Sequence, residues 1–257
     1  MDKNTLYIKG IKLEKEIPKG NYLNELSVIK NLKKSGGIIF KKPITFFVGE
    51  NGIGKSTLIE AIAVQSGFNP EGGSKNYNFS TKQTHSILCD YMTIVKGFNL
   101  AKWGYFLRAE SFYNTTSYID YLDIEHWSDN DYVSYLRKQE VADNSCSSHN
   151  MSHGESFLRT VSTFGGKGLY ILDEPEAALS PSGIMKLMCY IQELVKKEAQ
   201  FIISTHSPLL IASPNAEIYQ ITEKGFDKVS YDQTDHFQIT KRFLNNTEQM
   251  LRYLFEE

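Results

Sequence analysis

The sequence predicts an α/β fold in which helices flank a mostly parallel β-sheet. Continuous apolar runs, typical of buried parallel strands, occur at residues 44–48, 168–172 and 201–204. Residues 57–65 and 181–197 have the periodicity of helices. Predicted strands and helices therefore alternate along the chain. This alternation favours a parallel sheet over an all-β or all-helical architecture.

The N-terminal part has a different pattern. Residues 6–13 alternate apolar and polar side chains, which indicates an early strand, and residues 38–48 form a strand pair or one long strand. We expect these segments to make an antiparallel N-terminal β part. Residues 69–80 are dense in Pro, Gly and Asn, which predicts a long ordered loop, and residues 103–109 resemble a further strand.

The middle of the chain is more polar. Residues 111–150 are rich in Tyr, Ser, Asp and Asn and lack a strand pattern, which favours short helices. With the helix that follows, they predict a small helical subdomain over about residues 111–165. Two short strands and one terminal helix, residues 237–255, complete what we interpret as a single domain, residues 1–257.

Composition excludes several classes of protein. The hydrophobic content is 41% and the net charge is −2, values typical of a soluble globular protein without a general attraction to nucleic acid. The basic strip at residues 30–42 could bind phosphates or form a solvated surface. Cys89, Cys146 and Cys189 form no C-x-x-C pair, which argues against a zinc site and indicates a reducing compartment. Without a signal peptide or an apolar run of about 18 residues, we expect a cytoplasmic protein with no direct membrane insertion.

Residues 49–56 carry the clearest chemistry, with the sequence GENGIGKS. This is the G-x-x-x-x-G-K-[ST] phosphate loop, placed between an apolar strand and a helix, and it predicts a P-loop NTPase. Its backbone N–H groups can form an anion nest at the helix N-terminus. Lys55 would reach the β- and γ-phosphates, and the Ser56 hydroxyl would bind Mg²⁺. The residues expected to contact the nucleotide are Gly49, Glu50, Asn51, Gly52, Ile53, Gly54, Lys55, Ser56 and Thr57.

Two adjacent carboxylates end the apolar run at residues 168–172. Ligands bind at the carboxyl edge of parallel sheets, so Asp173 would hold Mg²⁺ beside Ser56. Glu174 would face the γ-phosphate and orient or deprotonate the attacking water. His206, just after the next buried strand, could hydrogen-bond the γ-phosphate as a neutral imidazole, although a surface or capping role is the alternative.

In this order the motifs resemble those of the ABC-type ATPases. Residues 49–56 resemble Walker A, residues 151–156 (MSHGES) a variant of the LSGGQ signature, and residues 173–174 the end of Walker B with its catalytic glutamate. Residues 176–180 resemble the D-loop, and His206 resembles the switch histidine. The resemblance spans about residues 38–212.

A narrower resemblance covers nearly the whole chain. The sequence is similar to small stand-alone bacterial ATPases of the AAA/ABC type. The segments that carry it are FFVGENG (46–52), EGGSKN (71–76), RAESF (108–112), SHGESF (152–157) and DEPEAALSP (173–181).

The resemblance implies an ATP hydrolase that uses ATP and Mg²⁺ in a head-to-tail homodimer. Ser152, Gly154 and Glu155 of one subunit would then contact the γ-phosphate bound to the other. A hydroxyl, a small residue and a helix N-terminus suit an anion, while a plain capping turn before residues 156–164 is the alternative.

The chain also departs from the family pattern. His153 replaces the first glycine of the signature, and Glu155 replaces its glutamine. Ser180 occupies the position at which many D-loops have aspartate. The 97 residues between Lys55 and Ser152 leave room for a helical subdomain. They do not suffice for the long coiled-coil arms of the chromosome-maintenance and recombination ATPases. This chain resembles the head domains of that soluble branch, without the arms.

Three further assignments are open. Glu110, after the strand at 103–109, is the candidate for the Q-loop position and for metal and water contacts, and Gln83 is its rival. Tyr22 could stack on adenine or be an ordinary core or surface tyrosine. Arg108, with the aromatic-rich residues 112–121, could form a partner surface or pack locally.

The leading hypothesis is a soluble ATPase that acts as a nucleotide-dependent switch on an unknown protein or nucleic-acid partner. A nucleic-acid-associated clamp or a defence-system ATPase is the first alternative. The ATPase subunit of a membrane transporter fits less well, because the signature diverges and the glutamine loop has no clear counterpart. A small-molecule kinase would need neither the signature-like segment nor His206.

Overall fold

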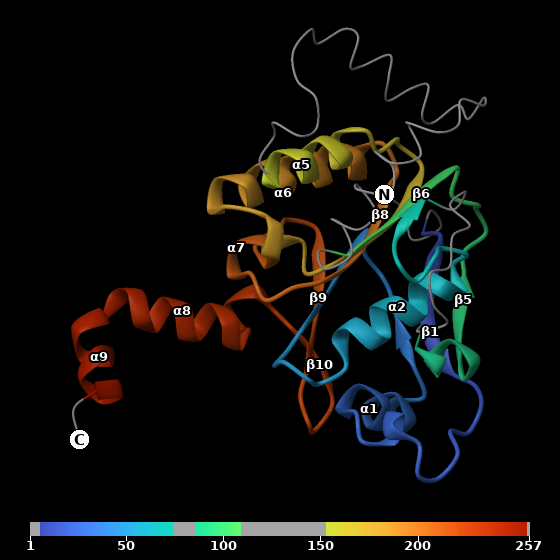
Figure 1. Ribbon diagram of the computed structural model, residues 1–257, viewed down its shortest axis with the longest axis horizontal. Coiled ribbons are helices and arrows are strands. Elements are labelled where there is room, and N and C mark those ends of the chain that lie inside the picture. The colour runs from blue at the N-terminus through green and yellow to red at the C-terminus, as the bar shows by residue number, and fades with distance from the viewer. Residues whose placement is uncertain (1–5, 75–85, 109–152, 256–257) are drawn as a thin grey trace, which may run out of the picture.

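The computed structural model describes residues 6–74, 86–108 and 153–255, and it confirms the mixed α/β fold (Figure 1). Within these residues, the larger sheet has seven strands in the order β10-β9-β3-β8-β7-β6-β4. The five central strands are parallel, and an antiparallel strand lies at each edge. The strands are β3 (Ile44–Val48), β4 (Gly73–Ser74), β6 (Trp103–Arg108), β7 (Gly168–Asp173), β8 (Gln200–Ser204), β9 (Ala216–Ile221) and β10 (Phe226–Val229).

A second sheet forms the expected antiparallel N-terminal part. Its order is β2-β1-β5, with β1 (Ile8–Leu13) paired to both β2 (Ile38–Ile39) and β5 (Met92–Lys96). Residues 38–48 therefore contain two separate strands rather than one long strand. These strands, β2 and β3, belong to different sheets. β5 is a strand that none of the sequence patterns above predicts.

Helices cover both faces of the larger sheet. The α-helices of the described residues are α1 (Ser27–Ser35), α2 (Lys55–Gln65), α5 (His153–Ser162), α6 (Pro181–Lys196), α7 (Pro208–Ile211), α8 (Asp235–Asn245) and α9 (Thr247–Phe255). Short 3-10 turns are η1 (Tyr22–Asn24), η2 (Ile87–Asp90), η4 (Pro175–Ala178) and η5 (Tyr231–Gln233).

The sheet separates two hydrophobic cores. Successive side chains of a strand point to opposite faces, so in β3 Phe47 packs into the core shared with α1, α2 and the second sheet. Phe46 and Val48 pack into the other core, under α5, α6 and α7. Because β3 is buried on both faces, its sequence is a continuous apolar run.

The carboxyl edge of the parallel strands brings distant residues together. In the ladder register, Asp173 at the end of β7 is opposite Ser204 of β8, and Ser204 is opposite Phe47 of β3. The loop that follows β3 therefore begins beside Asp173 and Ser204, although more than 120 residues separate these segments in the chain.

The C-terminal segment corrects one sequence expectation. Instead of one helix over residues 237–255, the chain forms α8 and α9, separated at Asn246, whose φ of −138° and ψ of 48° are not helical. The Thr247 hydroxyl donates to the Phe243 carbonyl, and Met250 N–H donates to the Asn246 carbonyl, so a new helix begins there. Neither helix contains a buried residue, and both extend away from the sheet (Figure 1).

Other expectations fall outside the described residues. They include most of the helical subdomain expected over residues 111–165, of which the structure describes α5, and residues 75–80 of the expected long loop. No described helix is long and apolar enough to cross a membrane. Cys89 and Cys189 are free thiols, the first buried and the second exposed.

Candidate functional site

The loop at residues 49–54 connects β3 directly to α2. Its three glycines have positive φ values of 152° at Gly49, 75° at Gly52 and 101° at Gly54, which side chains rarely tolerate. A Cβ on Gly54 would also lie 2.6 Å from Cγ1 of Val28 in α1. Backbone conformation and close packing therefore both require glycine where the loop enters α2.

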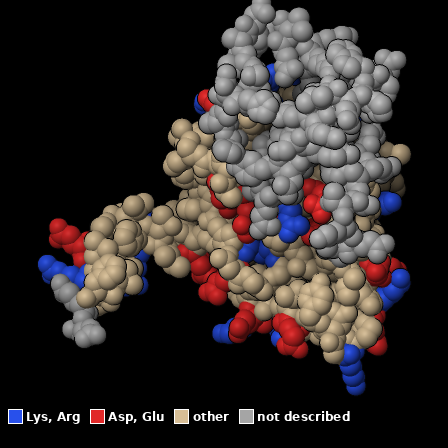
Figure 2. Space-filling view, in the orientation of Figure 1, with Lys and Arg blue, Asp and Glu red and all other residues tan. Residues whose placement is uncertain are grey.

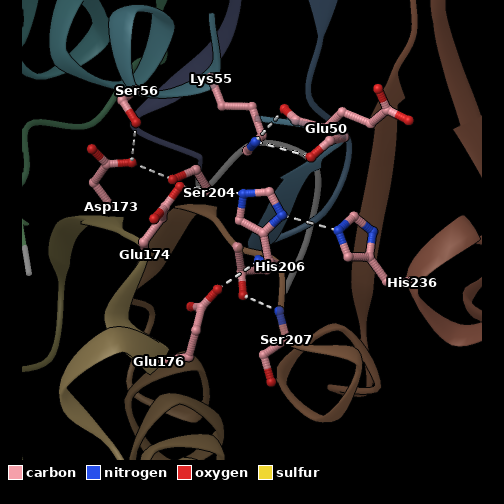
Figure 3. Close-up of polar contacts among 12 residues, drawn as sticks. Glu50, Lys55, Ser56, Asp173, Glu174, Glu176, Ser204, His206, Ser207 and His236 are labelled. Atoms are coloured by element: carbon pink, nitrogen blue, oxygen red, sulfur yellow. Dashed lines mark hydrogen bonds and ion pairs between the residues drawn. The ribbon is translucent and has the colours of Figure 1, made fainter. Parts of the chain in front are cut away.

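Lys55 begins α2, and its side chain turns back into the loop (Figure 3). Its Nζ donates to the carbonyl oxygens of Gly49, at 2.9 Å, and Glu50, at 2.8 Å. The residue is only 4% exposed. Burial lowers the pKa of the Lys55 amine, and the negative charges of Glu174, Asp173 and Glu176 oppose this shift.

Asp173 lies at the centre of the polar cluster. Its Oδ1 accepts hydrogen bonds from the hydroxyl of Ser56, at 3.2 Å, and from that of Ser204 (Figure 3). The guanidinium Nε of Arg108 lies 3.5 Å from its Oδ2. Burial raises the pKa of the Asp173 carboxyl, while the Ser204 hydrogen bond and Arg108 lower it. The expected neighbours Asp173 and Ser56 are in direct contact.

These two side chains form a donor set that suits magnesium. Mg²⁺ prefers oxygen ligands, keeps several waters and commonly uses one or two protein ligands together with substrate phosphates. The Asp173 carboxylate and the Ser56 hydroxyl supply such oxygens on adjacent elements. Among the described residues, no group of three or more His, Cys, Asp or Glu side chains could hold a metal by itself.

Arg108 joins the cluster from β6. Besides Asp173, it contacts Glu60 of α2, with Nη1 3.0 Å from Oε2. A partner surface and local packing were both open for this residue from the sequence, and the structure shows it paired with two buried carboxylates. The sequence feature that could have indicated this role for Arg108 is its position at the carboxyl end of a predicted strand.

The Glu174 side chain lies next to the His206 ring (Figure 3). Its φ of 50° and ψ of 51° place it in the left-handed region, which turns its side chain out of the strand. Its backbone N–H donates to the Ser204 carbonyl at 3.1 Å. Its Oε1 lies 3.3 Å from Nε2 of His206. The two adjacent carboxylates therefore face different neighbours.

His206 follows β8 and is held from two sides. Its backbone N–H donates to Oε1 of the half-buried Glu176, at 2.5 Å, and its ring Nδ1 lies 3.1 Å from Nε2 of His236 in α8. Burial lowers the pKa of both histidines, with a further contribution from the positive charge of Lys55. Burial raises the pKa of the Glu176 carboxyl.

The signature-like segment is described only in part. Ser152 lies outside the described residues, and α5 begins at the next residue, with Glu155 in its first turn. A Cβ on Gly154 would lie 3.0 Å from the carbonyl oxygen of Ala178 in η4, so α5 packs closely against the segment after Glu174. Ser180 caps α6 by accepting a hydrogen bond from Gly183 N–H at 3.2 Å.

The remaining candidates stay predictions. Glu110 and Gln83 both lie outside the described residues. Tyr22 lies in η1 and is 56% exposed. The helix after it approaches the phosphate loop, since Val28 N–H donates to the Ile53 carbonyl at 3.2 Å.

Sequence reasoning missed two contributors to this cluster. Ser204 looked like the end of a buried strand, and only strand register places its hydroxyl on Asp173. His236 is 30 residues beyond His206 and belongs to no recognisable motif. Both depend on pairings between distant segments, which a local pattern does not encode.

Comparisons with known proteins agree with the motifs. Residues 148–212 match the family described as "AAA domain, putative AbiEii toxin, Type IV TA system", a match that includes the signature-like segment, Asp173, Glu174 and His206. No curated protein sequence matches the chain. The family match and the motifs support a stand-alone ATPase of the ABC/AAA type.

Several solved structures resemble this one. The ADP conformation of MJ1267, an ATP-binding cassette of an ABC transporter, has 16% identity and a TM-score of 0.49, covering 98% of this chain and 100% of that one. A nucleotide-free ATP-binding cassette from an ABC transporter has 16% identity and a TM-score of 0.48, covering 92% and 96%. CbiO1 from Clostridium perfringens, part of the transporter complex cbiONQ, has 16% identity and a TM-score of 0.48, covering 98% and 99%.

Proposed function

We propose that this chain binds ATP with Mg²⁺ at the loop of residues 49–56 and hydrolyses it to ADP and phosphate. One observation carries the proposal. The Asp173 carboxylate contacts the Ser56 hydroxyl at the start of α2, while the next residue, Glu174, lies 3.3 Å from His206. A phosphate loop, a hydroxyl–carboxylate pair that suits Mg²⁺ and a separate carboxylate–imidazole pair thus lie at one sheet edge.

The binding roles follow from the contacts. The buried Lys55 amine is held by two carbonyl oxygens, and phosphate oxygens of ATP would replace them as stronger, charge-assisted partners. Backbone N–H groups of the loop and of Ser56 and Thr57 would bind the β-phosphate at the α2 N-terminus. Ser56 and Asp173 would hold Mg²⁺, with Glu110 as a further metal contact. The ion would neutralise charge on the phosphate oxygens.

Glu174 is the proposed catalytic base. Its side chain is 39% exposed, so water can reach it, whereas Asp173 is 4% exposed and is occupied by hydroxyl and guanidinium donors. A carboxylate beside the γ-phosphate can orient a water and accept its proton as the water attacks. His206 would donate a hydrogen bond from Nε2 to the γ-phosphate.

We further propose that the complete site forms between two copies of the chain, head to tail. Ser152, Gly154 and Glu155 of one copy would contact the γ-phosphate bound to the other. The supporting feature is α5, which begins at His153 and is ten residues long, so its N-terminal amides carry partial positive charge. ATP would then act as a switch that assembles the dimer on a partner, and hydrolysis would release it.

The test compares Glu174→Gln with the wild type. The variant keeps the size of the side chain but cannot accept a proton, so we expect ATP affinity within a few-fold of wild type. Phosphate release should fall at least ~100-fold. Glu198→Gln is the control, because the Glu198 side chain is 46% exposed and pairs with Lys167 at 3.2 Å. Glu198 precedes β8, so it lies at the sheet edge opposite the site.

Oligomeric state provides the second measurement. Light scattering after size-exclusion chromatography should show Glu174→Gln as a dimer with saturating ATP and Mg²⁺, and as a monomer without them. A variant that binds ATP but stays monomeric would overturn the composite site. Hydrolysis at the wild-type rate would overturn the assignment of Glu174 as the base.

The description of the matched family names a toxin, which favours one second candidate, a toxin or defence-system ATPase. We propose nucleic acid as the partner of this candidate. It predicts that DNA or RNA stimulates phosphate release, in a complex that weakens steeply with salt. Unchanged rates with either nucleic acid, at low and at physiological salt, would exclude this candidate.

A further inference from the structure

The contact between His206 and His236 has no role in the proposed function so far. Nδ1 of His206 and Nε2 of His236 are 3.1 Å apart, and the rings are inclined at 59° (Figure 3). Nε2 of His206 is buried and makes no hydrogen bond within the described part of the chain, although Oε1 of Glu174 lies 3.3 Å away. His206 is therefore paired on one ring nitrogen and directs the other toward the catalytic carboxylate.

His236 is held in place by the anchored start of α8. Asp235 and Gln220 of β9 make two hydrogen bonds, with Gln220 Nε2 donating to Asp235 Oδ2 at 2.6 Å and Asp235 N–H donating to Gln220 Oε1 at 3.1 Å. The buried Thr234 caps the helix, its hydroxyl accepting from Phe237 N–H. Gln220 pairs with Val48, the residue before the phosphate loop, so His236 is fixed relative to that loop.

The ionisation states restrict the proton positions. Burial lowers the pKa of both rings, and the positive charge of Lys55 lowers both further. His206 also lowers the pKa of His236. Glu174 and Glu176 also face His206, and Asp235 raises the pKa of His236. Above pH 7 both imidazoles are therefore neutral, and each carries one ring proton.

One proton lies in the contact between the two rings. If His206 supplied it from Nδ1, its Nε2 would present a lone pair to the Glu174 carboxylate, which is repulsive. If His236 supplies it from Nε2, His206 is protonated on Nε2 and presents an N–H toward Glu174 and the γ-phosphate. The second arrangement is electrostatically favoured.

We propose that His236 is a positioning residue, which donates from Nε2 to Nδ1 of His206 and thereby keeps the Nε2 proton of His206 directed at the γ-phosphate. The inference rests on the proposed function, since it assigns His206 a phosphate contact. It extends the site to α8, which no sequence motif includes.

Two matched variants separate the hydrogen bond from the shape of the side chain. His236→Phe keeps a ring but has no donor, whereas His236→Gln carries an amide N–H about as far from Cα as the imidazole Nε2. We expect kcat of His236→Phe to fall about 10- to 100-fold, with KM for ATP within about threefold. His236→Gln should recover most of the loss. Ile239→Ala, on the same helix and 65% exposed, is the control.

A double variant and the pH dependence of kcat provide two further tests. A purely structural role of His236 would not produce the results expected in either. Adding His236→Phe to His206→Ala should not lower kcat further, because the second change acts only through the first. In the wild type, kcat should fall as the pH drops below the ordinary range of an imidazole and the pair gains a proton, since the pKa of both rings is lowered. This fall should be weaker in His236→Gln, which does not titrate.

A spectroscopic measurement does not depend on hydrolysis. In protein labelled with ¹⁵N-histidine, ring nitrogen shifts identify the protonated nitrogen of His206, whose signals are assigned by their loss in His206→Ala. We expect Nε2–H in the wild type and His236→Gln, and a shift toward Nδ1–H in His236→Phe.

The outcomes separate the inference from the proposed function. An unchanged His206 tautomer in His236→Phe would overturn the inference, and so would wild-type kcat. If the tautomer changes as expected but the wild-type chain releases no phosphate, the proposed function fails and the positioning contact stands.

Discussion

At the residue scale, the site is built from side chains that share their partners. Asp173 accepts from Ser56 and Ser204, and it also pairs with Arg108, which in turn pairs with Glu60. Such a cluster is stable only when each charge is compensated, since a buried carboxylate without a cation is costly. Arg108 therefore holds together two carboxylates, one at the carboxyl end of β7 and one inside α2.

Replacing Arg108 should be destabilising. Arg108→Met leaves Glu60 and Asp173 without that cation, and we expect the free energy of unfolding to drop by about 1–3 kcal/mol. This is less than for a fully buried pair, because Arg108 is 25% exposed. Arg108→Lys should lose less, since it keeps the charge but not the forked geometry. Urea unfolding of the wild type, Arg108→Lys and Arg108→Met measures this order of stability. Equal unfolding midpoints for the three proteins would contradict it.

At the element scale, the predictable segments are those whose signals are local. The strand–loop–helix unit of β3, the phosphate loop and α2 follows from an apolar run, three glycines and a helical period, and Asp173 and Glu174 follow from a run that ends in carboxylates. Ser180 and Pro181 likewise mark the start of α6. These signals need no knowledge of the rest of the chain.

The missed features depend on tertiary placement. The break between α8 and α9 lies in the polar run Asn245-Asn246-Thr247, within a segment whose apolar period continues through it. His236 becomes part of the site only because Gln220 of β9 binds Asp235. No local rule pairs a strand residue with a helix start 15 residues later, so the sequence could not place His236.

Two truncations test the separate roles of α8 and α9. Ending the chain after Asn246 removes α9, which buries no residue, and we expect Tm to change by less than about 2 °C with kcat unchanged. Ending it after Ser230 also removes His236, so kcat should fall as in His236→Phe. Differential scanning fluorimetry and phosphate release measure both. A large loss of Tm or kcat on removing α9 alone would show that this helix supports the site.

At the scale of the whole molecule, one chain brings together only part of what the proposed reaction needs. Lys55, Asp173, Glu174 and His206 share one sheet edge, whereas the signature-like segment begins a helix that packs on η4. A head-to-tail pair of chains would bring the two parts together twice, related by two-fold symmetry. The site would then be sensitive to the concentration of the chain as well as that of ATP.

Mixing two inactive variants tests this arrangement. Lys55→Ala removes the phosphate contact of its own site, and Ser152→Arg blocks the site of its partner, so each homodimer should be inactive. In an equal mixture, half of the dimers are mixed, and each contains one site built from two intact parts. Phosphate release should therefore recover to roughly a quarter of the wild-type rate. Recovery should grow with total protein concentration. A mixture as inactive as its components, although both variants fold and Ser152→Arg binds ATP, would contradict a site shared between two chains.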